Sequence, residues 1–475
     1  MSTIPDYESY DAIGLAALIA KREVTPLEVL DEAITRAEKY NPVINAITLK
    51  LYDRARDATQ TATGPFAGVP FLLKDLGAML TGTVSSGSSK LFADAVADHD
   101  ATIVTRYLAA GLTIFGRSAS PELGLATSTE PAMFGPCRNP WNLDYSAGGS
   151  SGGAAASVAA RILPVAHATD GGGSIRIPAS ACGLFGLKPT RARNPSGPDV
   201  GEGWGGQSVG HCVSISVRDS AALLDATSGP DVGDPYWAPR PAGPFLDELT
   251  RPPKLLRIAL TTSAFNGEPV DPECRLAAED AAKLCESLGH NVTLAGPVLD
   301  HAPVREAQRI IVAANIRALL ANRAAALGRT LTADDVEPMT WSVADLARQY
   351  SAADYANAIT RIHSVGRVVG QFFLDYDILL TPTMCAPPPR LGVVSPSNPD
   401  DEAYVTAINR GIGFTSLFNA AGNPAMSVPL HWTASGLPIG VQFVAPFGDE
   451  AALFRLAAQL EQAKPWKDRR PSMTA

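Results

Sequence analysis

Two stretches near the middle of the chain decide the fold: Gly148-Gly149-Ser150-Ser151-Gly152-Gly153 and Asp170-Gly171-Gly172-Gly173-Ser174-Ile175-Arg176-Ile177-Pro178. Glycine runs cost backbone entropy and mark places where the chain comes close to something else. A pair of flexible linkers is the alternative. It is disfavoured because the stretches flank an Ala-rich helical segment, 154–160, and an apolar run, Ile162–Ala166. Each stretch is therefore expected to open or adjoin regular structure.

The second stretch has the composition of an oxyanion hole. Gly171–Gly173 and Ser174 offer consecutive backbone N–H groups around a hydroxyl. Such donors stabilise the charge that develops on a tetrahedral acyl intermediate, and losing one costs about 3 to 4 kcal/mol of transition-state stabilisation. A serine hydroxyl is a weak nucleophile at neutral pH, so a base must remove its proton. Lys74 and Ser150 are the candidates for that proton relay.

Lys74 is the candidate base because it follows an apolar run. Val69–Leu73 contains no charge and predicts a strand, with Lys74 and Asp75 directly after it. A lysine accepts a proton only when burial disfavours its charged form, and this strand-end position allows such burial. An ordinary solvated lysine at a strand end is the alternative interpretation.

Together the motifs resemble the amidase signature family. The resemblance rests on the two glycine-serine stretches, on the upstream segment Gly68–Asp75, and on three later segments: Cys182–Thr190, Thr381–Thr383 and Asn423–Ala425. It covers most of the chain outside Val304–Phe373. The family implies an α/β fold in which a central mixed, twisted β-sheet is covered on both faces by helices, with a helical region capping the substrate. Alternating apolar runs and helical segments favour the same fold class.

Site roles follow from the resemblance, position by position. It implies that Ser174 is the acyl-accepting nucleophile, that Ser150, preceded by a cis peptide bond, passes its proton, and that Lys74 is the terminal base. Asp170 and Arg176 flank the nucleophile and are expected to fix its loop. From the residues alone, each could equally form a surface ion pair.

The chain differs from many of the proteins it resembles at Gly171, and from the amidotransferase subunits among them at Ile177. Many relatives carry a bulkier residue in place of Gly171, as in Asp-Ile-Gly-Gly-Ser, so a more flexible first oxyanion donor is expected here, with catalysis retained. Amidotransferase subunits, which pass ammonia from a partner protein to an acylated tRNA, commonly have Gln where this chain has Ile177. That activity is the alternative function. The net charge of −9 disfavours this alternative, because RNA binding depends on basic residues that neutralise the phosphates.

Other catalytic arrangements compete for the same residues. Gly149–Gly153 also matches the nucleophile elbow, which would make Ser151 the nucleophile rather than a supporting residue. That motif needs a strand directly before it, whereas Cys137–Ala147 is interpreted as a loop because it contains Pro, Asn and Asp. His167 and His211 lie close enough in sequence for a Ser-His arrangement, although structural roles are favoured.

Composition limits the partners. The acidic balance argues against nucleic acid. The six cysteines are scattered, and the chain has no metal-ligand spacing, Walker loop or dinucleotide fingerprint, so neither metal nor organic cofactor is expected. Met1–Tyr10 has no apolar core like that of a signal peptide, and no stretch approaches eighteen unbroken apolar residues. These features predict a cytoplasmic protein without a membrane span, either a monomer or a homodimer.

The chain is expected to organise as one amidase domain. Its predicted parts are an N-terminal helical region (1–65), the signature core (66–230), a Pro-rich linker (231–253), a core continuation (254–300), a helical substrate cap (301–375) and a C-terminal core (376–475). Within it, helices are expected from Pro26 to about Tyr40 and from Asp271 to Leu288, and strands at Ile378–Leu380, Ala425–Leu430 and Ile439–Val444.

Hydrolysis of a small amide is therefore the predicted function, with esters or carbamates as further substrates, because the oxyanion hole recognises the carbonyl. The signature and its flanks are similar to those of bacterial amidases acting on a cyclic aminohexanoate dimer, on aryl amides or on urethanes. The pocket is expected to be lined by Val304–Phe373 and by loops near Met133-Phe134 and Trp204, which suit a hydrophobic substrate.

Overall fold

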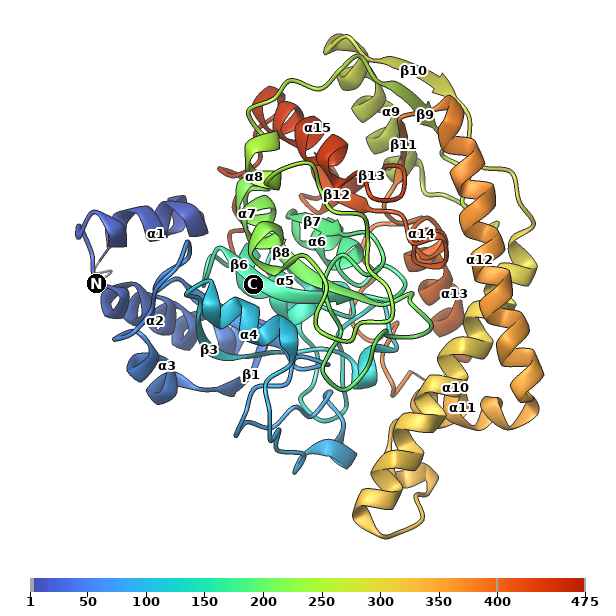
Figure 1. Cartoon of the computed structure of the whole chain (residues 1–475), viewed down its shortest axis with the longest axis horizontal. Coiled ribbons are helices and arrows are strands. Elements are labelled where there is room, and N and C mark those ends of the chain that lie inside the picture. Colours follow the sequence, from blue (N-terminus) through green and yellow to red (C-terminus); the bar gives the residue numbers. More distant parts are fainter. Residues whose placement is uncertain (1–3, 399, 474–475) are drawn as a thin grey trace.

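Apolar runs of the sequence form the strands of a large mixed sheet, seen in a computed structural model that describes residues 4–398 and 400–473 (Figure 1). Eight strands pair in the order β10-β9-β11-β13-β12-β7-β8-β6. The first three strands in that order run parallel, and the remaining neighbours are antiparallel. The strands are β6 (Val165–Asp170), β7 (Phe185–Lys188), β8 (Val209–Ser214), β9 (Arg257–Leu260), β10 (Asn291–Leu294), β11 (Ile378–Pro382), β12 (Ala425–Trp432) and β13 (Pro438–Val444).

Lys74 belongs to a separate sheet of three strands. In it, β3 (Thr113–Ser118) lies between β1 (Ile47–Lys50), which is antiparallel to it, and β2 (Pro70–Lys74), which is parallel to it. The strand β2 does not pair with the large sheet through backbone hydrogen bonds but packs against β6. The predicted central mixed sheet is the eight-stranded one. The additional three-stranded sheet was not predicted, because hydrophobic periodicity identifies strands and not their partners.

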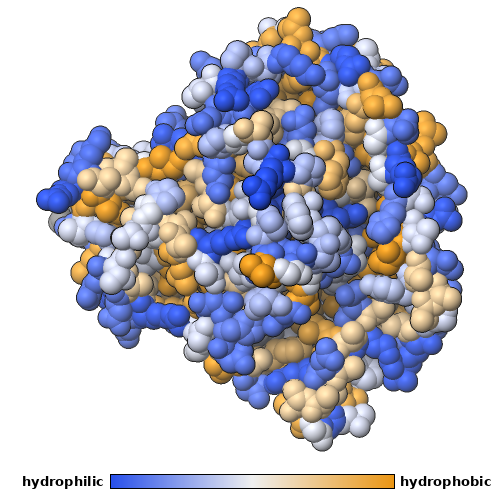
Figure 2. Space-filling view, in the orientation of Figure 1, coloured by the Kyte–Doolittle hydropathy of each residue, from blue (hydrophilic) through white to orange (hydrophobic). Residues whose placement is uncertain are grey.

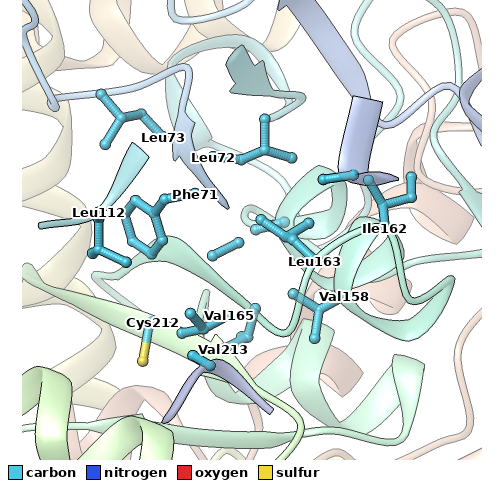
Figure 3. Packing of buried hydrophobic residues seen from close by; sticks show 14 of the residues in the cluster. Phe71, Leu72, Leu73, Leu112, Val158, Ile162, Leu163, Val165, Cys212 and Val213 are labelled. Carbon is cyan, nitrogen blue, oxygen red and sulfur yellow. The ribbon is translucent and has the colours of Figure 1, made fainter. Parts of the chain in front are cut away.

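A large apolar core fixes β2 in place. Phe71, Leu72 and Leu73 of β2 meet Val165 of β6 and Val158 of helix α5 (Gly152–Ala159) in one cluster (Figure 3). Fully burying an aliphatic or Phe side chain of this kind stabilises the fold by about 1.5 to 3 kcal/mol relative to leaving it exposed. The core thereby holds the strand that ends in Lys74 against the two elements that adjoin the glycine-serine stretches.

Helices surround the two sheets (Figure 1). The predicted helix α2 begins with a capping box: Thr25 accepts from the Glu28 N–H, and the Glu28 side chain accepts from the Thr25 N–H. The helix continues through Pro42 to Ile44, beyond its expected end. The remaining helices are α1 (Ala12–Ala20), α2 (Pro26–Ile44), α3 (Tyr52–Ala58), α4 (Thr102–Ala109), α6 (Arg176–Cys182), α7 (Val217–Thr227), α8 (Phe245–Glu248), α9 (Pro272–Ser287), α10 (His301–Leu327), α11 (Pro338–Leu346), α12 (Ala352–Asp375), α13 (Asp401–Ile412), α14 (Ser416–Ala421) and α15 (Glu450–Ala463).

The helices predicted for the cap region, residues 301–375, are present. Helices α10 and α12 pack side by side along one flank, and α11 lies between them in the chain (Figure 1). By length and composition alone, α10 could cross a membrane, and it is the one helix within residues 4–398 and 400–473 that could. Core helices pass the same test, and Ile311 and Ile316 of α10 are buried in the apolar clusters that the cap shares with the sheet and its loops.

Three local expectations are wrong. The strand expected at Ile162–Ala166 begins only at Val165 and continues to Asp170, because polar residues are tolerated where both strand faces are covered. The segment interpreted as a loop, Cys137–Ala147, contains a two-stranded ribbon of β4 (Arg138–Asn139) and β5 (Asn142–Ser146). The Pro-rich stretch is not wholly a surface linker, since Phe245 at the start of α8 is buried in the core.

The molecular surface mixes hydrophilic and hydrophobic residues. On the face shown in Figure 2, hydrophobic atoms form separate small groups among hydrophilic ones. Exposed large apolar residues include Val232, Leu294 and Val298. Scattered residues of this kind are normal on a protein surface and need no partner to explain them.

Candidate active site

Lys74 ends β2 with its side chain fully buried. Its Nζ lies 2.7 Å from Ser150 Oγ and 2.9 Å from Thr169 Oγ1 and donates to both. Burial lowers the pKa of Lys74 to about 7, although the Asp170 carboxylate acts in the opposite direction. The alternative of a solvated lysine is therefore wrong, and a substantial fraction of the amine is neutral near pH 7.

Ser150 lies in a tightly packed bend before α5. The peptide bond between Gly149 and Ser150 is cis, which confirms the sequence-based expectation. A Cβ added at Gly149 would come within 2.6 Å of the Ala126 carbonyl oxygen and 2.7 Å of the Ser128 nitrogen, so only glycine fits there. The bend thus aims the Ser150 hydroxyl at Lys74 from a fixed backbone.

Ser174 is the fourth residue of the five-residue loop, 171–175, that connects β6 to α6. It is half-buried, unlike Ser150 and Lys74, so it is the member of the three that solvent reaches most readily. Within the part of the chain that the structure describes, no hydrogen bond joins the Ser174 and Ser150 hydroxyls. Catalytic hydrogen bonds are commonly long in unliganded enzymes and tighten once substrate is bound.

The oxyanion loop differs from the expectation at one donor. The Gly173 N–H donates to Asp170 Oδ1 at 2.8 Å, so this group is already occupied. Gly173 also has φ +138°, and a Cβ there would meet Thr415 Oγ1 at 2.5 Å. Among the described residues, the N–H groups of Gly171, Gly172 and Ser174 have no hydrogen-bond acceptor. Three of the four predicted donors therefore stay available for a developing oxyanion.

Asp170 and Arg176 form a buried ion pair. The Arg176 guanidinium donates to Asp170 Oδ2 at 2.9 Å and to Oδ1 at 2.8 Å, and both side chains have zero exposure. Burial alone would raise the pKa of Asp170, but the charge and hydrogen bonds of Arg176, with Lys188 and Asn419, hold it below its ordinary range. The alternative of a surface pair is wrong. The expected loop-fixing role matches this geometry, since Asp170 also accepts from the Ile175 N–H at 3.1 Å.

Residues from the C-terminal part complete the loop's support. Thr415 Oγ1 donates to the Gly172 carbonyl at 2.6 Å, while the Thr415 carbonyl accepts from Arg176 at 2.9 Å. Asn419 of α14 donates to the Asp170 carbonyl and carboxylate, and Gln442 of β13 accepts from Arg176 at 2.7 Å. Sequence reasoning missed these residues, as it missed Thr169. The only available signal was the nearby Asn423–Ala425 segment.

The competing catalytic residues have other partners. His167 Nδ1 accepts from the backbone N–H of Lys74 at 3.2 Å, and burial, with the charges of Lys74 and Arg117, lowers the pKa of His167 to about 3. His211 Nε2 lies 2.9 Å from Ser220 Oγ. Ser151 is fully buried, and its hydroxyl donates to the Thr169 carbonyl at 3.3 Å. None of the three has the exposure and partners that a nucleophile or its base needs.

A large cavity among the described residues is lined by other side chains. It has a volume of about 820 Å³ and includes Met133, Glu122 and Glu337 in its walls, but none of Lys74, Ser150 and Ser174. Met133, which was predicted to lie near the substrate pocket, lines this cavity. Within residues 4–398 and 400–473, no group of three or more His, Cys, Asp or Glu side chains is placed to hold a metal ion.

Comparison with known proteins fits this arrangement. Residues 28–454 match the Amidase family. The chain belongs to the amidase signature family. A 6-aminohexanoate-cyclic-dimer hydrolase of Paenarthrobacter ureafaciens is 39% identical over 476 residues, covering 98% of this chain and 96% of the relative.

Solved amidase structures share the fold. A 6-aminohexanoate cyclic dimer hydrolase complexed with substrate superposes with a TM-score of 0.94 at 38% identity, covering 98% of this chain and 99% of its own. A bacterial aryl acylamidase of the amidase signature family gives 0.86 at 28% identity, with 96% of each chain covered. The protein is thus an amide hydrolase acting on non-peptide C–N bonds of a small molecule, and the amidotransferase alternative is less favoured.

Proposed function

We propose that this amidase cleaves its substrate through an acyl-enzyme on Ser174, with Ser150 as the proton relay and Lys74 as the general base. The observation that carries the proposal is the Lys74 amine: it is fully buried, has its pKa lowered to about 7, and lies 2.7 Å from Ser150 Oγ. A neutral lysine in contact with a serine hydroxyl is a base ready to accept a proton.

In the first half-reaction, Ser174 Oγ bonds to the carbonyl carbon while its proton passes to Ser150, whose own proton passes to Lys74. The carbonyl oxygen becomes an oxyanion held by the free N–H groups of Gly171, Gly172 and Ser174. The C–N bond then breaks as Ser150 protonates the leaving nitrogen and recovers a proton from Lys74. An amine leaves, and the acyl group stays on Ser174.

Water completes the second half-reaction through the same groups. It attacks the acyl carbon and gives a proton to Ser150, which again passes one to Lys74. The ester bond to Ser174 breaks, the serine takes back a proton, and a carboxylic acid is released. The same steps serve esters and carbamates, because the oxyanion hole recognises the carbonyl and discriminates weakly among leaving groups.

A hydrophobic aliphatic amide is the substrate class we infer. The relatives at 39% and 40% identity are 6-aminohexanoate-cyclic-dimer hydrolases, and they match over 98% of this chain. Trp204, whose ring lies beside Gly171, packs with Leu125 and Val312 around one apolar cluster. The cyclic dimer of 6-aminohexanoate is therefore the first compound to assay, together with p-nitroanilides, esters and carbamates of matched chain length.

Active-site labelling tests the nucleophile. A fluorophosphonate should modify Ser174, and mass spectrometry of the digested protein should place the added mass on the peptide containing it. The Ser174→Ala variant should take up no label, whereas Ser151→Ala should be labelled like the wild type if it remains folded. Modification of Ser151 with Ser174 untouched would overturn the assignment and restore the nucleophile elbow.

A further inference from the structure

Trp204 has an unusual backbone. Its φ is +52°, in the left-handed region that bulky residues rarely adopt. Gln207 holds this conformation, because its backbone N–H and its Nε2 both donate to the Trp204 carbonyl, at 3.3 and 3.2 Å. Conformations of this kind persist only where the surroundings enforce them, and they are frequent at functional sites.

The support of Trp204 leads back to the catalytic loop. The Gln207 carbonyl accepts from Asn419 Nδ2 at 3.0 Å, and the same amide donates to Asp170. The Gln207 side chain also accepts from Gln308 of α10 at 2.9 Å. The segment that presents the indole is thus tied both to the loop beside Ser174 and to the helical cap.

The Trp204 ring fills the space that a side chain at Gly171, the first proposed oxyanion donor, would need. A Cβ added at Gly171 would lie 2.8 Å from Cε3 and 2.8 Å from Cζ3 of Trp204, and the next nearest atom, on Ser208, is 3.7 Å away. Gly171 has no positive φ, so its backbone conformation is open to other residues. The Trp204 ring is the one close obstacle among the described residues, and Gly171 is glycine because of it.

The Trp204 side chain also meets apolar side chains. Trp204 is half-buried and packs against the cluster that contains Leu123 and Ile316 and against the cluster that contains Ile311. A rigid aromatic wall thus runs from Gly171 to helix α10. The Trp204 ring cannot move away without disturbing its contacts with the cap helices. It therefore excludes bulky substrate groups from the space beside the oxyanion loop.

We propose that Trp204 determines substrate specificity by limiting the acyl group beside the scissile carbonyl to an unbranched apolar chain. This rests on the proposed role of Ser174. Because Ser150 protonates the leaving nitrogen, the amine side of the substrate faces Ser150, and the acyl chain takes the side of the indole. A branch at the carbon next to the carbonyl would then meet the Trp204 ring.

Substrate series test the specificity half of the proposal. With hexanoyl and 2-methylhexanoyl p-nitroanilides, Trp204→Ala should raise the branched-to-unbranched ratio of kcat/KM at least tenfold, and Trp204→Phe should raise it less. Trp237, which is 55% exposed, supplies the control: Trp237→Ala should leave the ratio unchanged. An unchanged ratio in Trp204→Ala would overturn the proposal, as would relaxation only toward branched amines.

A double-mutant cycle tests the steric half without relying on turnover. Gly171→Thr should lower the melting temperature because its side chain meets the indole, and adding Trp204→Ala should make the Thr substitution nearly harmless. If the two shifts in melting temperature simply add, the pairing of Gly171 with Trp204 is wrong. If the wild type neither turns over amides nor takes a fluorophosphonate at Ser174, the proposed function fails instead, and the cycle still reports on the pair.

Discussion

At the scale of single residues, the environment of Lys74 decides the chemistry. The same side chain in water has a pKa near 10.4 and is almost wholly protonated at pH 7. In β2 it is enclosed by the apolar core, and its two polar partners are hydroxyls, so the charged form is disfavoured. The sequence identified Lys74 by its place after an apolar run. Its partner Thr169 could not be found, because no local pattern links residues that come from different sheets.

Replacing the base should abolish most activity. Lys74→Ala is expected to lower kcat about 100- to 10,000-fold, the usual contribution of general base catalysis. Lys74→Arg should fail to restore it, because arginine cannot lose its proton in a protein. Steady-state kinetics, with circular dichroism to check folding, provide the measurement. Near-normal activity in Lys74→Arg would mean that this residue only positions its neighbours.

The Thr415 hydroxyl should matter for rate more than for binding. Thr415→Val keeps the side-chain shape but removes the hydrogen bond to the Gly172 carbonyl, so the oxyanion donors lose part of their alignment. We expect kcat to fall about 10- to 100-fold with KM little changed. Thr415→Ser, which retains the hydroxyl, is the matched control and should recover most of the rate. Equal kinetics in the Val and Ser variants would rule out this positioning role.

At the scale of elements, the strand β6 and the helix α6 lie on either side of Ser174, the proposed nucleophile. Asp170 is the last residue of β6, and Arg176 is the first residue of α6. Their buried ion pair therefore joins the two ends of the loop that contains Ser174. The sequence predicted both glycine-serine stretches beside regular structure, and that prediction is confirmed. The sequence predicted no helix over residues 401–422, although α13 and α14 lie there and α14 contains Asn419. These helices were missed because tertiary contacts outweigh the weak local helix propensity of the segment.

Removing the ion pair between Asp170 and Arg176 should destabilise the protein. Arg176→Met leaves the Asp170 carboxylate buried without its charge partner, which typically costs about 3 to 5 kcal/mol of folding free energy. Urea unfolding followed by fluorescence gives the value. Arg56→Met, which removes exposed pairs with Asp31 and Asp53, is the control and should cost about 0 to 1 kcal/mol. A similar small cost for both variants would contradict the structural role assigned to the buried pair.

At the scale of the whole molecule, the candidate site lies where two sheets meet. Lys74 comes from the three-stranded sheet, Ser174 follows a strand of the large sheet, and Ser150 precedes the helix packed between them. The fold class, the helices of residues 301–375 and the contact between Lys74 and Ser150 were predictable, because motifs and periodicity are local. The division into two sheets and the C-terminal support of the oxyanion loop were not, since both depend on contacts between segments far apart in sequence.

The pH dependence of kcat/KM tests the central claim most directly, because it reports the ionisation of the free enzyme. Folding lowers the pKa of Lys74 to about 7, and the neutral amine is the active form. Activity should therefore be low at acidic pH, rise through one ionisation near pH 7 and then stay level. Lys188, a second buried lysine with a pKa lowered to about 7, is the control: Lys188→Met should keep the midpoint. A flat profile between about pH 5.5 and 9 would contradict Lys74 as the base. A midpoint that differs between Lys188→Met and the wild type would also contradict it.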